Sequence, residues 1–344
     1  MSIQNRRKRP NSKGLPEIKS LEKYIQEYII GQDDHVRSII TAIYRARQLK
    51  SIKSNVLVVG KSGTGKTETL KQIAKKLNIA HTVEDATKYT EEGYYGADVD
   101  EMVQHLFENS GYKLRHAEQG MLIIDEIDKK ATRGDIIGRD SSGISVLKSL
   151  LKLVEGTKVK VYGEYDEEQY NEETYYFDTS NLIVFFLGAF SELDEIRKKR
   201  LGKGTIGFGR TEATANQFHR YIKKDLIEYG IPEEFAGRID TIIEMNNLTE
   251  LNLVEILKRS RLSVFKKYQS ALRQKGITLK YDPELFKAIA KEAMAVDTGA
   301  RELSNTVNYI FEKIIYDVFA NDGKFKICKP SLEIVKDNSK YVLE

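Results

Sequence analysis

One stretch of the sequence has the residue types and spacing that suit the binding of phosphate groups. Eight residues fit the pattern G-x-x-x-x-G-K-[ST], and they are Gly60, Lys61, Ser62, Gly63, Thr64, Gly65, Lys66 and Thr67. Glycines let consecutive backbone N–H groups turn inward around phosphate oxygens, and a following helix adds the positive end of its dipole. Lys66 is expected to reach the outer phosphates, and the Thr67 hydroxyl to ligate Mg²⁺. The pattern therefore predicts a binding site for ATP with Mg²⁺.

Two acidic residues, Asp125 and Glu126, directly follow the apolar run at 121–124. Such a run is typical of a central strand, whose end would bring both carboxylates to the phosphate site. Asp125 is expected to hold Mg²⁺ through water, and Glu126 to orient and activate the attacking water. Alone this pattern is weak, but together with the first one it predicts ATP hydrolysis.

The elements expected around these residues alternate between strands and helices. Apolar strands are predicted at 55–59, 121–124 and 182–187, and helices at 67–77 and 145–155. A short amphipathic segment at 21–30 precedes a helix that reaches about Lys50. Apolar strands that alternate with helices favour a parallel sheet covered on both faces, and hence an α/β fold.

The sequence changes character after about residue 247. Thr249 is expected to begin one long charged helix that runs towards Arg273. A short strand at 277–281, a helix opened by Asp282 and Pro283, and a last helix at 301–319 follow. We predict a disordered basic tail at 1–16, a large α/β ATPase domain at 17–246 and a small α-rich domain at 247–344.

Composition narrows the classes of protein. The longest apolar run, at 182–190, is far below the roughly 18 residues that a spanning helix needs, and no signal peptide is visible. We therefore expect a cytoplasmic protein without a membrane partner. The net charge of +4 is too small to imply nucleic acid, although the basic tail could contact phosphate. One cysteine, Cys328, and five histidines without metal-ligand spacing predict no zinc site.

From Leu21 onward the chain resembles ClpX, the AAA+ protein unfoldase, in several ordered motifs. Tyr28-Ile29-Ile30-Gly31-Gln32 looks like the family's adenine-pocket segment, and the segment 125–129 matches its extended acidic motif. Leu187-Gly188-Ala189-Phe190 is close to the family's Gly-Gly-Ala-Phe. The resemblance implies an AAA+ P-loop domain in which Tyr28, Ile29 and Ile30 offer an apolar surface to the purine.

Two arginines stand in segments that resemble functional motifs of that family. Arg238 ends an octet similar to the one that carries the arginine finger, and Arg301 ends Thr298-Gly299-Ala300-Arg301, which matches the sensor-2 motif. An arginine finger stabilises charge in the transition state of phosphoryl transfer. The resemblance implies that Arg238 reaches the site of a neighbouring subunit, and that Arg301 brings the small domain onto bound nucleotide.

Three further segments resemble the parts of ClpX that handle polypeptide. Gly93-Tyr94-Tyr95-Gly96 looks like the pore-loop signature, with Tyr95 in place of the usual valine, and Arg139 begins a segment similar to a second pore loop. Ile206-Gly207-Phe208 matches the tripeptide that docks onto the ClpP peptidase. The resemblance implies a homo-hexamer that pulls unfolded or tagged proteins through its pore and delivers them to ClpP. No motif predicts a peptidase activity of the chain's own.

The chain also departs from typical ClpX. The four-cysteine zinc domain has no counterpart in this sequence, and acidic residues between Glu164 and Glu173 replace a basic loop expected at the pore mouth. We expect this acidic stretch to favour basic segments of client proteins. For the sensor-1 position Asn181 is only a weak candidate.

Two other functions stay open at this point. The first is a remodelling chaperone that works without a peptidase, and the second is an AAA+ nucleic-acid motor or loader that uses the basic tail. The tyrosines between Gly93 and Gly96, together with the small net charge, argue against the second.

Overall fold

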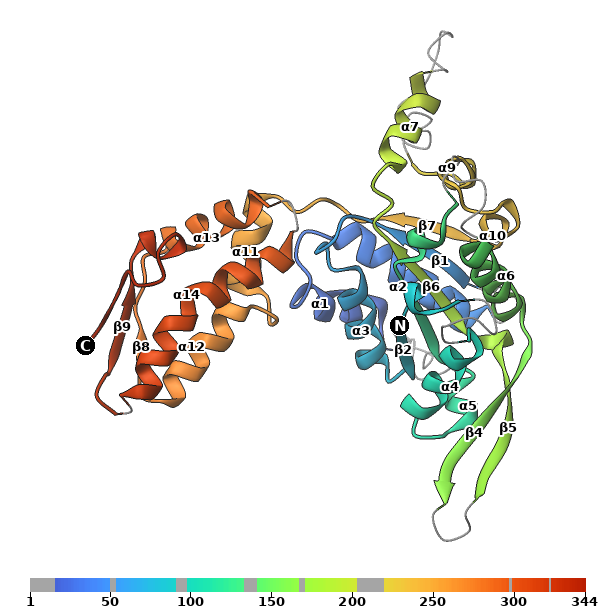
Figure 1. The fold of residues 1–344 in the computed structure, drawn as a ribbon, viewed down its shortest axis with the longest axis horizontal. Helices are drawn as coiled ribbons and strands as arrows, with labels where there is room; N and C mark the ends of the chain where they lie inside the picture. Colours follow the sequence, from blue (N-terminus) through green and yellow to red (C-terminus); the bar gives the residue numbers. More distant parts are fainter. Residues whose placement is uncertain are drawn as a thin grey trace, which may run out of the picture.

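The computed structural model describes residues 16–49, 54–90, 98–132, 141–166, 171–202, 220–296, 299–321 and 323–344. The chain forms a larger part that contains a parallel sheet and a smaller part built mainly of helices (Figure 1). The segment that joins the two parts leaves the sheet after β7 and enters the first helix of the smaller part, α11. No helix in the described ranges is long and apolar enough to cross a membrane.

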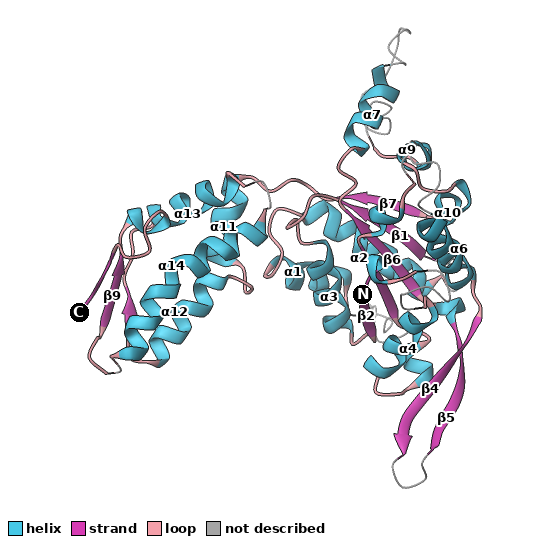
Figure 2. Ribbon diagram, in the orientation of Figure 1, coloured by secondary structure: helices cyan, strands magenta, loops and turns pink. Residues whose placement is uncertain are grey.

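The sheet of the larger part has five strands, all parallel (Figure 2). In spatial order they are β2 (His81–Asp85), β3 (Met121–Asp125), β6 (Ile183–Gly188), β1 (Ser54–Val59) and β7 (Thr241–Glu244). Carboxyl ends of parallel strands meet at one edge, so the residues that follow β1, β3 and β6 lie together. This edge carries the P-loop (residues 60–67), the acidic pair Asp125 and Glu126, and Gly188.

Helices cover both faces of the sheet because successive side chains of a strand point to opposite faces. Val56 and Val58 of β1 belong to a core shared with α1 (Ile18–Gln26), α2 (Asp33–Gln48) and α3 (Lys66–Leu77). Leu57 and Val59 belong to a second core, shared with α4 (Asp100–Asn109), α6 (Ser141–Glu155) and α10 (Glu233–Arg238). The described residues of this part also form α5 (Leu114–Ala117), α7 (Leu193–Gly202) and α9 (Lys223–Tyr229). The expected parallel sheet with helices on both faces is confirmed.

A β-hairpin projects from the larger part where the sequence suggested only an acidic loop (Figure 1). It consists of β4 (Lys158–Asp166) and β5 (Asn171–Asp178), which pair antiparallel. The side chain of Gln104 on α4 bonds both backbone groups of Tyr162, at 2.8 and 2.9 Å, next to a register shift in the hairpin. The acidic residues of this stretch that the structure describes, Glu164, Asp166, Glu172 and Glu173, therefore belong to the strands of a projecting hairpin, while Glu167 and Glu168 lie outside the described residues.

The described residues of the smaller part form four α-helices, a short 3-10 helix and a three-stranded sheet. The helices are α11 (Glu250–Arg259), α12 (Val264–Gln274), α13 (Glu284–Met294) and α14 (Ala300–Ala320), and the strands are β8 (Thr278–Leu279), β9 (Ile327–Pro330) and β10 (Tyr341–Leu343). Their apolar side chains form a core of their own around Phe265 and Phe311. Phe265 and Phe311 pack edge to face within this core. Among the described residues, the core shares none with the two cores on the faces of the sheet, so this part has an interior of its own.

The predicted single helix from Thr249 to Arg273 is wrong, because the chain breaks between α11 and α12. At the break the Ser260 hydroxyl donates to the Tyr28 carbonyl at 2.7 Å, and the Arg261 N–H donates to the Glu27 carbonyl at 2.8 Å. A continuous helix would pair the Arg261 N–H with the carbonyl four residues earlier in the same helix. The break instead docks the smaller part onto the turn between α1 and α2.

Candidate functional site

The P-loop connects β1 to α3, as the sequence predicts. Gly63 and Gly65 have φ angles of +77° and +94°, a conformation that side chains rarely adopt, and α3 begins at Lys66. The Thr64 hydroxyl donates to the Lys61 carbonyl at 2.8 Å and closes the turn. The loop therefore presents the start of α3 towards the edge of the sheet where β3 ends.

Lys66 is a buried cation inside this loop. Its ammonium group donates to the carbonyl of Gly60 and, at 3.1 Å, to that of Lys61. Burial lowers the pKa of Lys66, whereas the nearby carboxylates of Asp125 and Asp128 raise it. Negative phosphate oxygens would act in the same direction as these carboxylates, so the site favours an anionic ligand.

Thr67 and Asp125 come together from the start of α3 and the end of β3. The Thr67 hydroxyl donates to the Asp125 carboxylate at 2.8 Å. A hydroxyl and a carboxylate are oxygen ligands of the kind that Mg²⁺ prefers, and Mg²⁺ in nucleotide sites is usually held by one or two carboxylates plus phosphates. The residues present therefore fit the predicted metal.

Glu126 adopts a strained backbone next to this pair. Its φ is +59°, and its N–H donates to the Asp125 carboxylate at 2.9 Å. Left-handed backbone at a residue other than glycine is unfavourable, and such strain gathers at functional sites. The exposed Glu126 side chain lines the same cavity as Lys66 and Thr67.

The cavity over the P-loop has a volume of about 760 Å³ and is lined from both parts of the chain. Arg301, at the start of α14, contributes to its wall beside Lys66 and Asp125. The Ala300 N–H donates to the Gly63 carbonyl at 3.2 Å, so α14 begins in direct contact with the P-loop. Sequence reasoning missed Asp128, which lines the same cavity, is buried, and accepts the Phe190 N–H at 3.3 Å.

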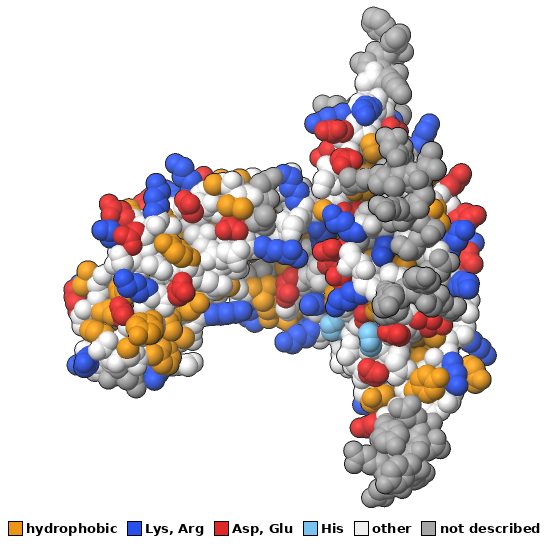
Figure 3. Space-filling model, in the orientation of Figure 1, with side chains coloured by type: hydrophobic (Ala, Val, Ile, Leu, Met, Phe, Trp, Pro, Cys, Tyr) orange, Lys and Arg blue, Asp and Glu red, His pale blue; other side chains and the backbone are white. Residues whose placement is uncertain are grey.

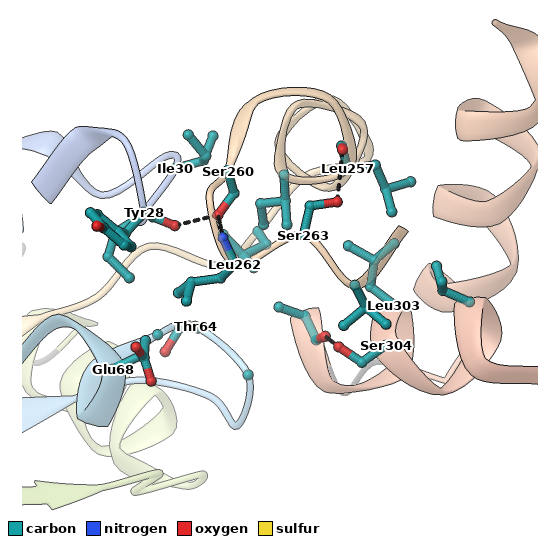
Figure 4. Close-up of a pocket in the computed structure, with 18 residues that line it drawn as sticks. Tyr28, Ile30, Thr64, Glu68, Leu257, Ser260, Leu262, Ser263, Leu303 and Ser304 are labelled. Carbon is teal, nitrogen blue, oxygen red and sulfur yellow. Dashed lines mark hydrogen bonds between the residues drawn. The ribbon is translucent and has the colours of Figure 1, made fainter. Parts of the chain in front are cut away.

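A second, apolar cavity of about 150 Å³ adjoins the P-loop (Figure 4). Tyr28, Ile29 and Ile30 line it on one side, and Gly63, Thr64 and Gly65 border it. The two volumes together fall within the range of roughly 300–1,000 Å³ that is usual for small-molecule sites. Taken together, the two cavities offer a charged compartment for phosphates beside an apolar one for a base.

The other side of the apolar cavity comes from the smaller part, and the sequence did not predict it. Its lining residues there are Leu248, Ile256, Leu257, Ser260, Leu262, Ser263, Val264, Ala300, Leu303, Ser304 and Val307. Several have the spacing of an ordinary helix core, so the sequence alone could not separate pocket from core. The break at 260–263 is the structural feature that turns three of them towards the pocket.

Arg238 lies at the opposite end of the sheet from the P-loop. It ends α10, and its carbonyl accepts the Asn55 side-chain amide at 3.1 Å near the start of β1. The step from Asn55 to Gly60 along a strand corresponds to about 17 Å. The Arg238 guanidinium pairs with Glu155 at the end of α6, and its side chain is 57% exposed. Figure 1 shows α6 and α10 on the side of the sheet away from the smaller part.

The polypeptide-handling candidates fall outside the described residues. Tyr94 and Tyr95 lie in 91–97, Arg139 lies in 133–140, and Ile206, Gly207 and Phe208 lie in 203–219. Described residues that precede the first two segments are in contact, because the Lys130 ammonium donates to the Tyr89 carbonyl at 2.8 Å. Asn181 is exposed at the amino end of β6 and so lies away from the P-loop.

Comparisons with known proteins agree with this geometry. Residues 51–242 match a family described as AAA domain (Cdc48 subfamily), and residues 248–326 match the C-terminal, D2-small domain of ClpB protein. A Bacteroides fragilis protein named ATP-dependent Clp protease ATP-binding subunit ClpX is 32% identical over 98% of this chain and 84% of its own length. The proteins of that name from Borrelia duttonii and Treponema denticola are also 32% identical, over 89% of this chain and 75% and 77% of their lengths.

The chain belongs to the ClpX family of AAA ATPases. It is therefore an ATP-binding enzyme that hydrolyses ATP, and the predicted α/β AAA+ fold with a small C-terminal domain is confirmed. The roles of the individual site residues remain predictions that the geometry makes specific.

Proposed function

We propose that this chain is an ATP-driven protein unfoldase that works as a homo-hexamer in the cytoplasm. It pulls unfolded or tagged polypeptides through a central pore and delivers them to a ClpP-type peptidase. The relatives named above are ATP-binding subunits of the Clp protease, which supports the peptidase as partner.

The observation that carries the proposal is the position of Arg238. This arginine lies at the amino end of the sheet, whereas the nucleotide cavity lies at the carboxyl end. It cannot reach its own phosphate site, but it is exposed and would be available to a neighbouring subunit. A head-to-tail contact of this kind closes into a ring when the rotation per subunit allows it.

Each residue of the site has a role in hydrolysis under this proposal. Lys66 binds the outer phosphates, and Thr67 and Asp125 would hold Mg²⁺, which neutralises charge on the phosphates when bound. Glu126 orients the attacking water and accepts its proton at the carboxylate. Arg238 of a neighbouring subunit stabilises the charge of the transition state, and Arg301 fixes the smaller part over the nucleotide.

Polypeptide handling is assigned to the segments that carry Tyr94, Tyr95 and Arg139. Tyrosine has a large amphipathic surface that can grip a polypeptide without recognising its sequence. The bond between Lys130 and the Tyr89 carbonyl joins the bases of these segments. The short helix η2 (Ile127–Lys130) directly follows the acidic pair. A movement of Glu126 could therefore be passed through η2 to Lys130 and, through its hydrogen bond, to Tyr89.

The test is ATP-dependent unfolding of a folded fluorescent reporter that carries a panel of unstructured tails, with and without ClpP. The expected result is loss of fluorescence with ATP, and degradation only when ClpP is present. A deletion of Ile206 to Phe208 should abolish degradation while ATP hydrolysis and unfolding persist. Unfolding that never leads to degradation would favour the stand-alone chaperone. ATP hydrolysis that unfolds no reporter with any tail would contradict the proposed function.

A further inference from the structure

Gln32 is a fully buried polar residue that the hydrolysis scheme does not use. It is the last residue of the adenine-pocket segment and directly precedes α2, whose first residue is Asp33. A buried amide that lacks partners is costly, so its hydrogen bonds decide why glutamine is tolerated there.

The Gln32 amide joins two segments that are far apart in the sequence. Its Oε1 accepts the backbone N–H of Asn246 at 2.9 Å, and its Nε2 donates to the backbone carbonyl of Asn246 at 2.8 Å. The same Nε2 lies 3.3 Å from the carbonyl of Thr64 in the P-loop. These partners fix the orientation of the amide, since a backbone N–H has to face oxygen and a carbonyl has to face N–H. One side chain thus connects the P-loop to the segment between the two parts of the protein.

That connecting segment, residues 245–248, is held along the P-loop before it leaves. The Met245 N–H donates to the carbonyl of Val59, the residue before the P-loop, at 2.7 Å. After Asn246, Leu248 enters the wall of the apolar cavity, and Thr249 caps α11. The hydrogen bonds between Gln32 and Asn246 therefore attach the connecting segment to the larger part, just before the smaller part begins.

A nucleotide in the two cavities would contact both parts, because the linings of both cavities draw on both. A ligand shifts a conformational equilibrium only as far as its affinities for the two states differ. Thr64 belongs to the P-loop, which would bind the phosphates. A change in this loop on nucleotide binding would therefore reach Gln32 through the Thr64 carbonyl.

We propose that Gln32 is a positioning residue that transmits the state of the P-loop to residues 245–248. It thereby sets the angle between the two parts of the protein when ATP binds. The inference rests on the proposed function only for the place of the phosphates. Its test uses no polypeptide, so a failure of threading would leave it untouched.

Two substitutions distinguish the effect of the Gln32 hydrogen bonds from the effect of the side chain's size. Gln32→Met keeps the length of the side chain and removes all three hydrogen bonds. Gln32→Glu keeps the acceptor for Asn246 but turns a carboxylate oxygen towards two carbonyls. A glutamate buried in this way has a raised pKa, so acid should protonate it and restore a donor. The matched control is Asn246→Ala, which leaves in place the backbone groups that Gln32 bonds and removes the separate bond from the Asn246 side-chain amide to the Gly31 carbonyl at 3.3 Å.

The measurement is energy transfer between dyes on cysteines introduced at exposed Arg115 in the larger part and exposed Lys313 in the smaller part. All proteins carry Glu126→Gln, so that saturating ATP stays bound. We expect ATP to change the transfer efficiency in the parent and in Asn246→Ala, and Gln32→Met to lose more than half of that change. In Gln32→Glu the change should be small at pH 8 and larger at pH 6, while the parent stays the same at both.

Two results would overturn the proposal. One is a full ATP-dependent change in Gln32→Met, which would show that the amide transmits nothing. The other is a response of Gln32→Glu that is equally small at both pH values, which would reduce Gln32 to a structural residue. The pH-dependent recovery keeps the test decisive even if Gln32→Met folds poorly.

Discussion

Replacing Gly31 with alanine tests how tightly the smaller part is seated on the adenine-pocket segment. Gly31 has a φ of +78°, and a Cβ built there would lie 2.8 Å from the side-chain nitrogen and 2.9 Å from the Cγ of Asn252 on α11. Gly111 provides a matched control in the same part of the protein. Its φ is +68°, and an added Cβ there would meet nothing within 4 Å.

The two substitutions share one cost and differ in another. Alanine in the left-handed region costs roughly 1–2 kcal/mol at either position. Asn252 cannot simply swing away, because its side chain accepts the Thr249 N–H at 3.0 Å and caps α11. Loss of such a cap costs typically about 1 kcal/mol. Gly31→Ala should therefore lower the free energy of unfolding by about 1 kcal/mol more than Gly111→Ala does. The difference should be larger if α11 itself has to move.

Urea titration followed by circular dichroism measures the difference, and titration with a fluorescent ATP analogue measures its effect on the site. Only Gly31→Ala should weaken nucleotide binding, since only that change pushes against α11, which contributes Ile256 and Leu257 to the wall of the apolar cavity. In an Asn252→Ala background the two alanine variants should cost the same. Equal unfolding midpoints for the single variants would refute the reasoning.

Three further predictions concern single residues. Lys66→Ala should abolish nucleotide binding, whereas Glu126→Gln should bind ATP with little change and lose turnover; normal steady-state ATPase in Glu126→Gln would remove Glu126 from catalysis. Tyr94→Ala should hydrolyse ATP at nearly the parent rate and fail to unfold a folded reporter, and undiminished unfolding would contradict a grip by this ring. Burial raises the pKa of the Cys328 thiol to about 12, so this single cysteine should react with a thiol reagent at pH 8 only after the smaller part unfolds. Rapid labelling of the native protein would show that its core opens more easily than the packing indicates.

The nucleotide site could be predicted because its chemistry is local in sequence. Glycine spacing, one lysine and one threonine define the P-loop, and an apolar strand that ends in Asp125 and Glu126 has one sensible place in a parallel sheet. The strands at 55–59 and 182–187 were equally clear, since strands buried on both faces are continuously apolar. The structure then brings Thr67 within 2.8 Å of Asp125, although 58 positions separate them.

The parts that escaped prediction depend on contacts across the chain. At the break the Ser260 hydroxyl bonds the carbonyl of Tyr28, more than two hundred positions away, and no local pattern indicates that bond. The local signal was Ser263, which caps α12. Gln32 acquires its partners in the same way, from Asn246. The hairpin is a different case. Alternation of apolar and polar residues from Lys158 to Tyr162 is a strand signal, and the acidic composition around it drew the interpretation towards a loop.

Complementation between two inactive variants tests whether Arg238 completes the ATP site of a neighbouring subunit. Arg238→Ala subunits keep Glu126, and Glu126→Gln subunits keep Arg238, so a mixed ring would contain interfaces in which both residues are intact. In a random one-to-one mixture about a quarter of the interfaces would be of this kind, given head-to-tail contacts. A role of Arg238 in the neighbouring subunit's site predicts that each variant alone is nearly inactive and that mixed rings recover ATP hydrolysis of that order. No recovery in rings shown to contain both subunits, or full activity of Arg238→Ala alone, would contradict it.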